Sequence, residues 1–340
     1  MNMTYEVGMS LFIGWDILAN IPPLFVIAVS ATLHLLLGII IHELVHLIFG
    51  FISGYSFSSF RVGSLVCFKE DKRLRFKISG SLIEGQCLMT PDPEKFKFVL
   101  YNLGGGIFNI IFLILFLILF ITIPRDSFWS IQLIMAIVIN FFIALSNLFP
   151  IRYLANDGAN VREALKCEEA ARGLHTMFLV NSEAMEGRRY RDFSEDMFKI
   201  SENADRDNYL IAYIIMLEAS RLEDLGSYDE AANLYESINL KKMPSIYKSL
   251  IMADLLYYYT IYKPDFEKAR EIYKDKKLRN ILNLNMPNFM RILAAYEFYV
   301  LDNKHKAVKL MEKAKIEADK LPNKGFRIME KEYIQKLNIG

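Results

Sequence analysis

The sequence has little net charge and few cysteines. Its 340 residues contain 40 Lys and Arg against 39 Asp and Glu, and the formal net charge of +1 excludes nucleic-acid binding driven by bulk charge. Cys67, Cys87 and Cys167 are too few and too scattered for a disulfide framework or a thiolate metal site. Residues 1–22 contain no Lys or Arg, so we do not expect a secretory signal there. The aromatic content of 13% excludes a disordered chain.

Charged residues are concentrated in the second half of the chain. Residues 1–160 hold only 10 of the 40 basic and 10 of the 39 acidic residues, although they make up almost half of the sequence. This apolar half contains three stretches long enough to cross a bilayer, which takes about 20 apolar residues. The predicted spans run from about 23 to 51, from 98 to 123 and from 129 to 149.

These features predict an α-helical integral membrane protein with two domains. Residues 1–165 would form a transmembrane domain with three core helices, and residues 166–340 a cytosolic all-α domain. The segment 58–90 alternates polar and apolar residues around a Lys-Glu-Asp-Lys turn, which predicts a small β-hairpin at the membrane surface. This hairpin is either a solvated element with a basic face or an edge strand that pairs with an extended peptide.

The basic residues also predict the orientation in the cell membrane. Eight of them lie in the segment 53–97, and the chain after Pro150 is rich in Lys and Arg, whereas residues 1–22 have none. By the positive-inside rule, this multi-pass chain places its N-terminus outside and its C-terminal domain in the cytosol. The three cysteines then face a reducing compartment as free thiols. We expect residues 1–22, which include Asp16, to form an interfacial or re-entrant piece rather than a fourth span.

The second half contains an internal repeat. The segments YDEAANLYE, FEKAREIYK and KHKAVKLME place Ala231, Ala269 and Ala307 at intervals of 38 residues. An aromatic-rich stretch precedes each segment, and a small Ala at a helix crossing is typical of stacked helical hairpins. The units resemble tetratricopeptide repeats, which implies a surface for a cytosolic protein or peptide partner.

The first span carries the motif His42-Glu43-Leu44-Val45-His46. Residues four apart share one face of a helix, so both imidazoles can bind one metal ion while Glu43 lies beside them as a general base. The alternative is a polar stripe packed against other helices, but each ionisable group in a bilayer costs about 2–3 kcal/mol unless it is paired or coordinated. His34 lies about 80° further round the helix, so we expect it to make packing or hydrogen-bond contacts only.

A second polar feature follows the third span. The stretch NLFPIRYLANDG begins at Asn147 and contains Asp157, which can act either as a metal ligand or as a helix N-cap. Asn156 is a weaker alternative as the third ligand, because a carboxylate brings charge as well as a lone pair. Glu84, in the predicted hairpin, is the next candidate after Asp157.

A third feature lies near the start of the second span. Gly104, Gly105 and Gly106 are followed by Asn109, a pattern that allows close helix packing and places a polar anchor inside the bilayer. By the predicted topology, all three polar features lie toward the cytosolic side of their spans. They can therefore meet at one point.

These motifs resemble those of the site-2 proteases, a family of intramembrane zinc metalloproteases. HELVH is similar to the family's first motif, NLFPIRYLANDG to its N-x-x-P and L-D-G motif, and the glycine stretch with its Asn to the G-x-x-x-N region. The resemblance covers roughly residues 25–165. It implies one Zn²⁺ per chain with His42, His46 and Asp157 as ligands, Glu43 as the catalytic base, and Asn147 and Asn109 as substrate-facing residues.

The function implied by the resemblance is that of an intramembrane zinc metalloendopeptidase. Its substrate would be a transmembrane or membrane-associated protein or peptide, recruited or regulated through the cytosolic helical array. One alternative is a membrane-tethered adaptor with a vestigial or structural metal site, although a structural zinc site needs no base such as Glu43. Another is a membrane-anchored peptidase that cleaves soluble peptides.

Overall fold

The computed structural model describes most of the chain after the N-terminal segment. The predictions for residues 1–22 and for Glu84 lie outside the described residues, which are 23–70, 73–78, 85–92, 96–151, 153–337 and 339.

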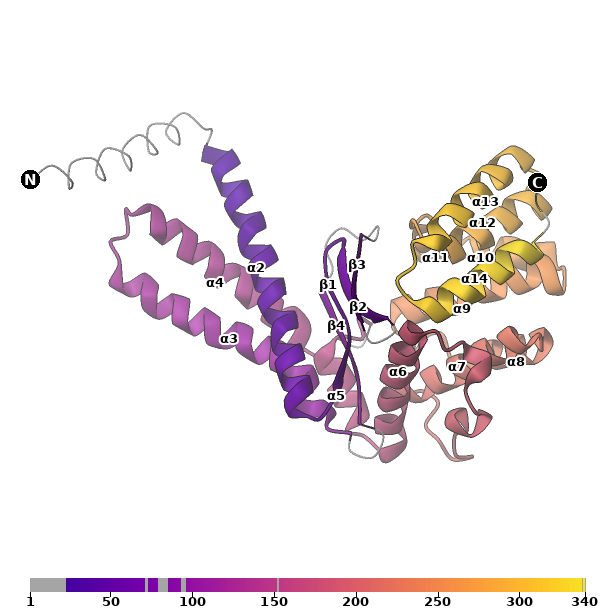
Figure 1. Ribbon diagram of the computed structural model, residues 1–340, viewed down its shortest axis with the longest axis horizontal. Coiled ribbons are helices and arrows are strands. Elements are labelled where there is room, and N and C mark those ends of the chain that lie inside the picture. Colours follow the sequence, from indigo (N-terminus) through magenta and orange to yellow (C-terminus); the bar gives the residue numbers. More distant parts are fainter. Residues whose placement is uncertain are drawn as a thin grey trace, which may run out of the picture.

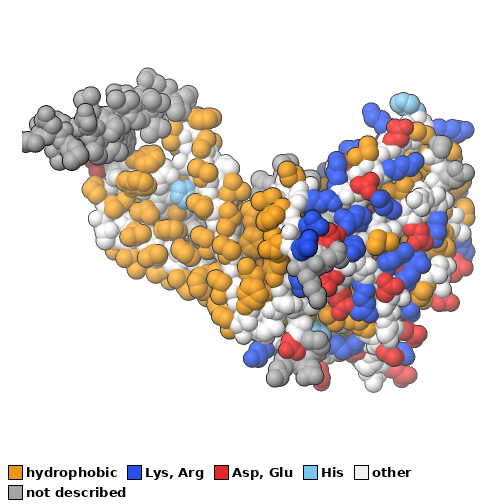
Figure 2. Space-filling view, in the orientation of Figure 1, with side chains coloured by type: hydrophobic (Ala, Val, Ile, Leu, Met, Phe, Trp, Pro, Cys, Tyr) orange, Lys and Arg blue, Asp and Glu red, His pale blue; other side chains and the backbone are white. Residues whose placement is uncertain are grey.

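Three long apolar helices form one arm of the molecule (Figure 1). They begin and end within one residue of the predicted spans: α2 (Pro23–Ile52), α3 (Phe98–Thr122) and α4 (Phe128–Leu148). Each is long and apolar enough to cross a membrane. Hydrophobic side chains cover most of the visible surface of this arm, whereas Lys, Arg, Asp and Glu gather on the other half of the molecule (Figure 2). The three apolar helices of the prediction are thus confirmed.

The predicted β-hairpin is instead part of a four-stranded antiparallel sheet. Its strands are β1 (Ser56–Val62), β2 (Leu65–Glu70), β3 (Arg73–Ile78) and β4 (Gly85–Thr90), in the order β3-β2-β1-β4. β2 and β3 pair as one hairpin, with Glu70 opposite Arg73. A tight turn at Gly63, which has a positive φ of 56°, joins β1 to β2. The prediction of a single hairpin over 58–90 was therefore wrong, because the alternating pattern continues through more than one turn.

The second half of the described chain is helical. Its longer helices are α5 (Asp157–Ala164), α6 (Glu168–Glu186), α7 (Tyr209–Leu225), α8 (Tyr228–Ser237), α9 (Ser245–Tyr257), α10 (Phe266–Tyr273), α11 (Lys276–Leu282), α12 (Pro287–Tyr299), α13 (Lys304–Asp319) and α14 (Lys324–Lys336). Short helical turns lie at Tyr190–Asp192 and Glu195–Phe198, and a wider turn at Tyr258–Tyr262 continues α9. Many of these helices begin at Asn or Asp residues whose side chains accept a hydrogen bond from the first turn, as N-caps do.

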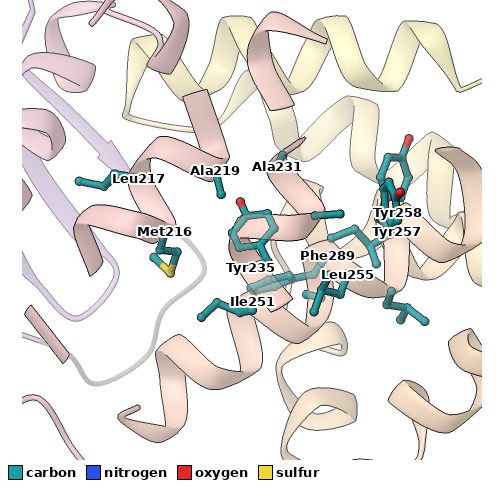
Figure 3. Close-up of a cluster of buried hydrophobic side chains, with 14 of the residues drawn as sticks. Met216, Leu217, Ala219, Ala231, Tyr235, Ile251, Leu255, Tyr257, Tyr258 and Phe289 are labelled. Atoms are coloured by element: carbon teal, nitrogen blue, oxygen red, sulfur yellow. The ribbon is translucent and has the colours of Figure 1, made fainter. Parts of the chain in front are cut away.

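The repeated segments correspond to α8, α10 and α13. Ala231, Ala269 and Ala307 are all buried, and each of these three helices packs against the helix pair partner that precedes it. Large side chains from several helices meet in this core, among them Tyr235 of α8 and Ile251 of α9 (Figure 3). The short helix α11 lies between the second and third helix pairs, so the array is irregular.

The helical array is docked on the sheet. Arg327 of α14 forms an ion pair with Glu70 of β2 at 2.7 Å. Lys77 of β3 donates to the backbone carbonyls of Asp319 and Leu321, at 2.8 and 3.2 Å. Helix α6 also packs against the sheet. The sheet therefore lies between the apolar helices and the array (Figure 1).

Candidate metal centre

Three side chains from two distant segments converge where the apolar helices meet the second half of the chain. His42 Nε2 and His46 Nε2 on α2 lie 3.0 Å apart. Asp157 Oδ2, at the start of α5, lies 3.4 Å from the first nitrogen and 3.3 Å from the second. The three ligand atoms lie within 4.8 Å of one another, so this group could hold a metal ion.

A relay of amides fixes the orientation of His42. Asn140 Nδ2 on α4 donates to the carbonyl of Ala136, which can only accept, so Asn140 Oδ1 faces Asn109 Nδ2 at 2.8 Å. Asn109 Oδ1 is then the atom that lies 2.7 Å from His42 Nδ1. Because a carbonyl oxygen accepts only, His42 Nδ1 carries the proton.

The backbone fixes His46 in the same way. His46 Nδ1 lies 2.6 Å from the carbonyl oxygen of Tyr101 on α3, so this nitrogen also carries its proton. In the neutral imidazoles both Nε2 atoms therefore present lone pairs, and these lone pairs face each other and the Asp157 carboxylate. Three acceptors so close together repel one another unless a cation lies between them, and second partners at Nδ1 are the usual arrangement of metal-binding histidines. The donor set fits a metal ion.

Asn156, rather than Asp157, is the N-cap of α5. Its Oδ1 accepts from the Ala159 amide at 2.9 Å, and its Nδ2 donates to the carbonyls of Ser146 and Phe149 at the end of α4, both at 2.6 Å. This leaves the Asp157 carboxylate free to turn toward the histidines. When the imidazoles are protonated, their charge and hydrogen bonds lower the pKa of Asp157 to about 2, although burial opposes ionisation.

Glycines allow the helices to approach the site closely. A Cβ on Gly105 would lie 2.7 Å from both His42 Cε1 and His46 Nε2, so a side chain there would displace the imidazoles. A Cβ on Gly158 would lie 2.1 Å from the carbonyl oxygen of Leu148. Gly105 therefore lets α3 cover the histidines, and Gly158 lets α5 pack under the end of α4.

Glu43 shares a cavity with the three candidate ligands. The cavity has a volume of about 620 Å³, and the buried Glu43 side chain lines it together with the metal group. The backbone amide of Cys87 on β4 donates to the Glu43 carboxylate. The Tyr101 hydroxyl donates to the Cys87 carbonyl at 2.5 Å. Strand β4 therefore runs directly beside Glu43.

The remaining predicted residues have different surroundings. Asn147 lines the cavity and donates from Nδ2 to the carbonyl of Ile143 at 2.9 Å. Asn109 is fully buried behind His42, with both polar atoms bonded to protein groups, and the described cavity lining does not include it. His34 bonds to the carbonyl of Ser30 at 2.8 Å, one turn away on its own helix, in keeping with the prediction.

Sequence reasoning missed Asn140 and Tyr101. A lone Asn in the middle of an apolar span was the available signal for Asn140, because a polar group inside a bilayer needs a partner. The contribution of Tyr101 to His46 is a backbone carbonyl, for which a sequence carries no signal. No protein-family model, curated protein or solved structure matches the chain.

Proposed function

We propose that this protein is an intramembrane zinc metalloendopeptidase that cleaves membrane-embedded or membrane-proximal protein segments. One observation carries the proposal: His42, His46 and Asp157 direct three acceptor atoms at a single point, and Glu43 lines the same cavity. The two histidines of this group lie within α2, one of three helices that are long and apolar enough to cross a membrane. Two imidazoles and one carboxylate are the ligand set of many catalytic zinc sites, which leave a fourth position open.

The chain's own residues have distinct roles in this proposal. His42, His46 and Asp157 would hold one Zn²⁺, and Asn109 and Tyr101 would keep both imidazoles in the ligating tautomer. When bound, zinc supplies Lewis-acid chemistry that polarises a carbonyl and acidifies water. Glu43 would accept a proton during attack on the peptide bond and later return it to the leaving amine. Asn147, on the cavity wall, is the proposed substrate-facing amide.

Strand β4 supports an extended form of the substrate. β4 is at the edge of the described sheet, and its Cys87 amide and carbonyl face Glu43 and Tyr101 instead of β1. A substrate strand that replaced these two contacts along this edge would bring its peptide carbonyls past Glu43. A transmembrane helix would have to unwind to bind in this way, because its carbonyls are engaged in helical hydrogen bonds.

The orientation belongs to the same proposal. The basic residues between the first two apolar helices and throughout the second half favour an external N-terminus and a cytosolic array. Cys167 is exposed at the start of α6 and is a free thiol. In intact cells it should be unreactive toward a membrane-impermeant maleimide and become reactive after lysis. Labelling of Cys167 from outside would contradict this orientation.

Replacement of the proposed base tests the activity directly. Glu43→Gln keeps the shape of the side chain but removes the proton acceptor, so cleavage of co-expressed single-span proteins should fall by at least 100-fold. Zinc content and expression should stay near those of the wild type. Glu230→Gln, an exposed carboxylate on α8, is the matched control. Cleavage at the wild-type rate by Glu43→Gln would disprove the protease, and an unchanged cellular function would favour the adaptor.

A further inference from the structure

A second cavity lies inside the helical array. Its volume is about 320 Å³, and four helices each contribute one charged side chain to its lining. We call it the acidic cavity and define it by Glu223 of α7, Asp254 of α9, Arg291 of α12 and Glu330 of α14. The cavity thus contains three carboxylates and one guanidinium group.

Arg291 and Glu330 form a buried ion pair that leaves one donor unused. Arg291 Nε and Nη2 donate to Glu330 Oε1 and Oε2, at 2.6 and 3.2 Å. The guanidinium also lies between the rings of Tyr257 and Tyr333, 4.4 and 4.9 Å from their centroids. Arg291 is only 4% exposed, and within the described part of the chain its Nη1 has no hydrogen-bond partner. A buried donor without an acceptor is costly, so an acceptor supplied by a ligand would stabilise it.

Glu223 and Asp254 are two further carboxylates without a matching positive charge in the cavity. Glu330 already neutralises Arg291, so these two partly buried carboxylates have no equivalent counter-ion in the cavity. Burial raises the pKa of Glu223 and of Asp254, and the charge on Asp254 raises that of Glu223 further. A cation placed between them would remove this repulsion.

The ligand suggested by this chemistry is an organic cation rather than a metal ion. Among the described side chains, only His42, His46 and Asp157 bring three suitable ligand atoms within 4.8 Å. Aromatic rings also line the acidic cavity, including those of Tyr190, Tyr235 and Phe289. Rings beside carboxylates favour an ammonium or guanidinium group on an apolar stem.

The acidic cavity adjoins the metal cavity. Both are lined by Asn181, Tyr213, Met286, Leu321 and Phe326. The two cavities are therefore neighbours, and a peptide bound across both would pass over these shared residues. Such a peptide would also bring the backbone carbonyl that Arg291 Nη1 lacks.

We propose that the acidic cavity binds a Lys or Arg side chain of an extended peptide. Glu223 and Asp254 pair with the cation, and Arg291 Nη1 donates to a neighbouring peptide carbonyl. Where the proposed protease function also holds, this peptide is the cytosolic flank of the substrate, because membrane-spanning segments carry Lys and Arg on that side. This extension rests on the proposed function, whereas the binding itself does not.

The test measures peptide binding to the full-length protein in detergent micelles. Every protein tested carries Glu43→Gln, so that no peptide is cleaved. The probes are pentapeptides, acetylated and amidated at their ends, with a central Arg, Lys or norleucine among alanines. Saturation-transfer NMR and thermal unfolding of the protein measure their binding. We expect the Arg and Lys peptides to bind at least tenfold more tightly than the norleucine peptide. The double variant Glu223→Gln/Asp254→Asn should abolish this preference, and the exposed pair Glu230→Gln/Glu312→Gln should keep it.

Three results would overturn the proposal. The first is equal binding of the Arg and norleucine peptides, and the second is an unchanged preference in the double variant. The third is tight binding of a norleucine peptide with a free N-terminus, which would assign the site to an α-amine. Because the double variant removes repulsion between buried acids, it should unfold at or above the wild-type temperature, and this separates lost binding from misfolding. These binding measurements do not depend on proteolysis, so a failure of the proposed protease function would not change how they are interpreted.

Discussion

Asn140 controls the candidate metal centre without touching it. Its bond to the Ala136 carbonyl orients Asn109, and Asn109 in turn orients His42. Partners of this kind typically change metal affinity by about 10- to 100-fold when they are removed. We therefore expect Asn140→Ala to weaken zinc binding by about this factor, measured by competition with a chromophoric chelator.

Ser146→Ala is a suitable comparison for that experiment. The Ser146 hydroxyl also lies on α4, but it bonds only to the Ile143 carbonyl of its own helix. Its removal should leave zinc affinity unchanged. Equal affinities for wild type and Asn140→Ala would show that the amide relay does not set the tautomer of His42.

Asp157 and Asn156 are neighbours with separable roles. Asp157→Ala should lose the bound zinc, because two neutral imidazoles remain without a compensating charge. Asn156→Ala should retain one zinc per chain at saturating metal while losing about 1 kcal/mol of stability, the usual cost of a missing N-cap. Mass spectrometry of the zinc content and thermal unfolding distinguish the two variants. A full equivalent of zinc in Asp157→Ala would place the third ligand elsewhere.

The sequence predicted the two histidine ligands because their spacing is local. His42 and His46 are one helical turn apart, so their shared face follows from helix geometry alone. Charge favoured Asp157 over Asn156 as the third ligand, but the sequence did not show which residue caps α5. The cap depends on where α4 ends in space, and two carbonyls of that helix hold Asn156.

At the scale of elements, the glycines of α3 set how closely two apolar helices approach. Gly105→Ala should expel the metal, because the new Cβ would displace both imidazoles. Gly106→Ala should keep the metal, because the atoms nearest to its Cβ belong to the Leu148 side chain and not to a histidine. Since Ala favours helix over Gly by up to about 1 kcal/mol, neither change weakens α3 itself.

Zinc content and circular dichroism of the two purified variants check this expectation. Both should retain the helical signal of the wild type. The same zinc content in Gly105→Ala and Gly106→Ala would contradict close contact between α3 and the histidines.

The sheet shows which part of an element can be predicted from a local pattern. Alternation over 58–90 predicted strands and one of the turns. It could not predict that β4 returns to pair with β1, where Phe60 lies opposite both Cys67 and Cys87. Such pairing depends on contacts between segments distant in sequence, and these place β4 rather than β2 beside Glu43.

At the scale of the whole molecule, the acidic cavity makes stability depend on pH. Burial raises the pKa of Glu223 from 4.5 to about 8 and that of Asp254 from 3.8 to about 7. Between these limits the folded chain holds protons that the unfolded chain has released, so the free energy of unfolding falls as pH rises. Glu223→Gln should remove part of this dependence and stabilise the protein above about pH 7, by roughly 1 kcal/mol.

Thermal unfolding at about pH 5 and about pH 8 measures this effect. The melting temperature of the wild type should fall more between the two pH values than that of Glu223→Gln. Glu230→Gln should behave like the wild type, because its carboxylate is exposed. An equal pH dependence in all three proteins would show that Glu223 ionises normally.

Strand β3 has a consequence for the behaviour of the isolated protein. Leu74, Phe76 and Ile78 are 60%, 70% and 76% exposed, and β3 is the outer strand of the described sheet opposite β4. β3 also carries Arg73, Arg75 and Lys77, so only one of its faces is apolar, but an outer strand with open backbone groups is still a template for pairing with another chain. Lipid would cover this strand in a bilayer, whereas after extraction it would seed self-association. A detergent that shields Leu74, Phe76 and Ile78 should therefore decide whether the protein is recovered as single chains or as aggregates.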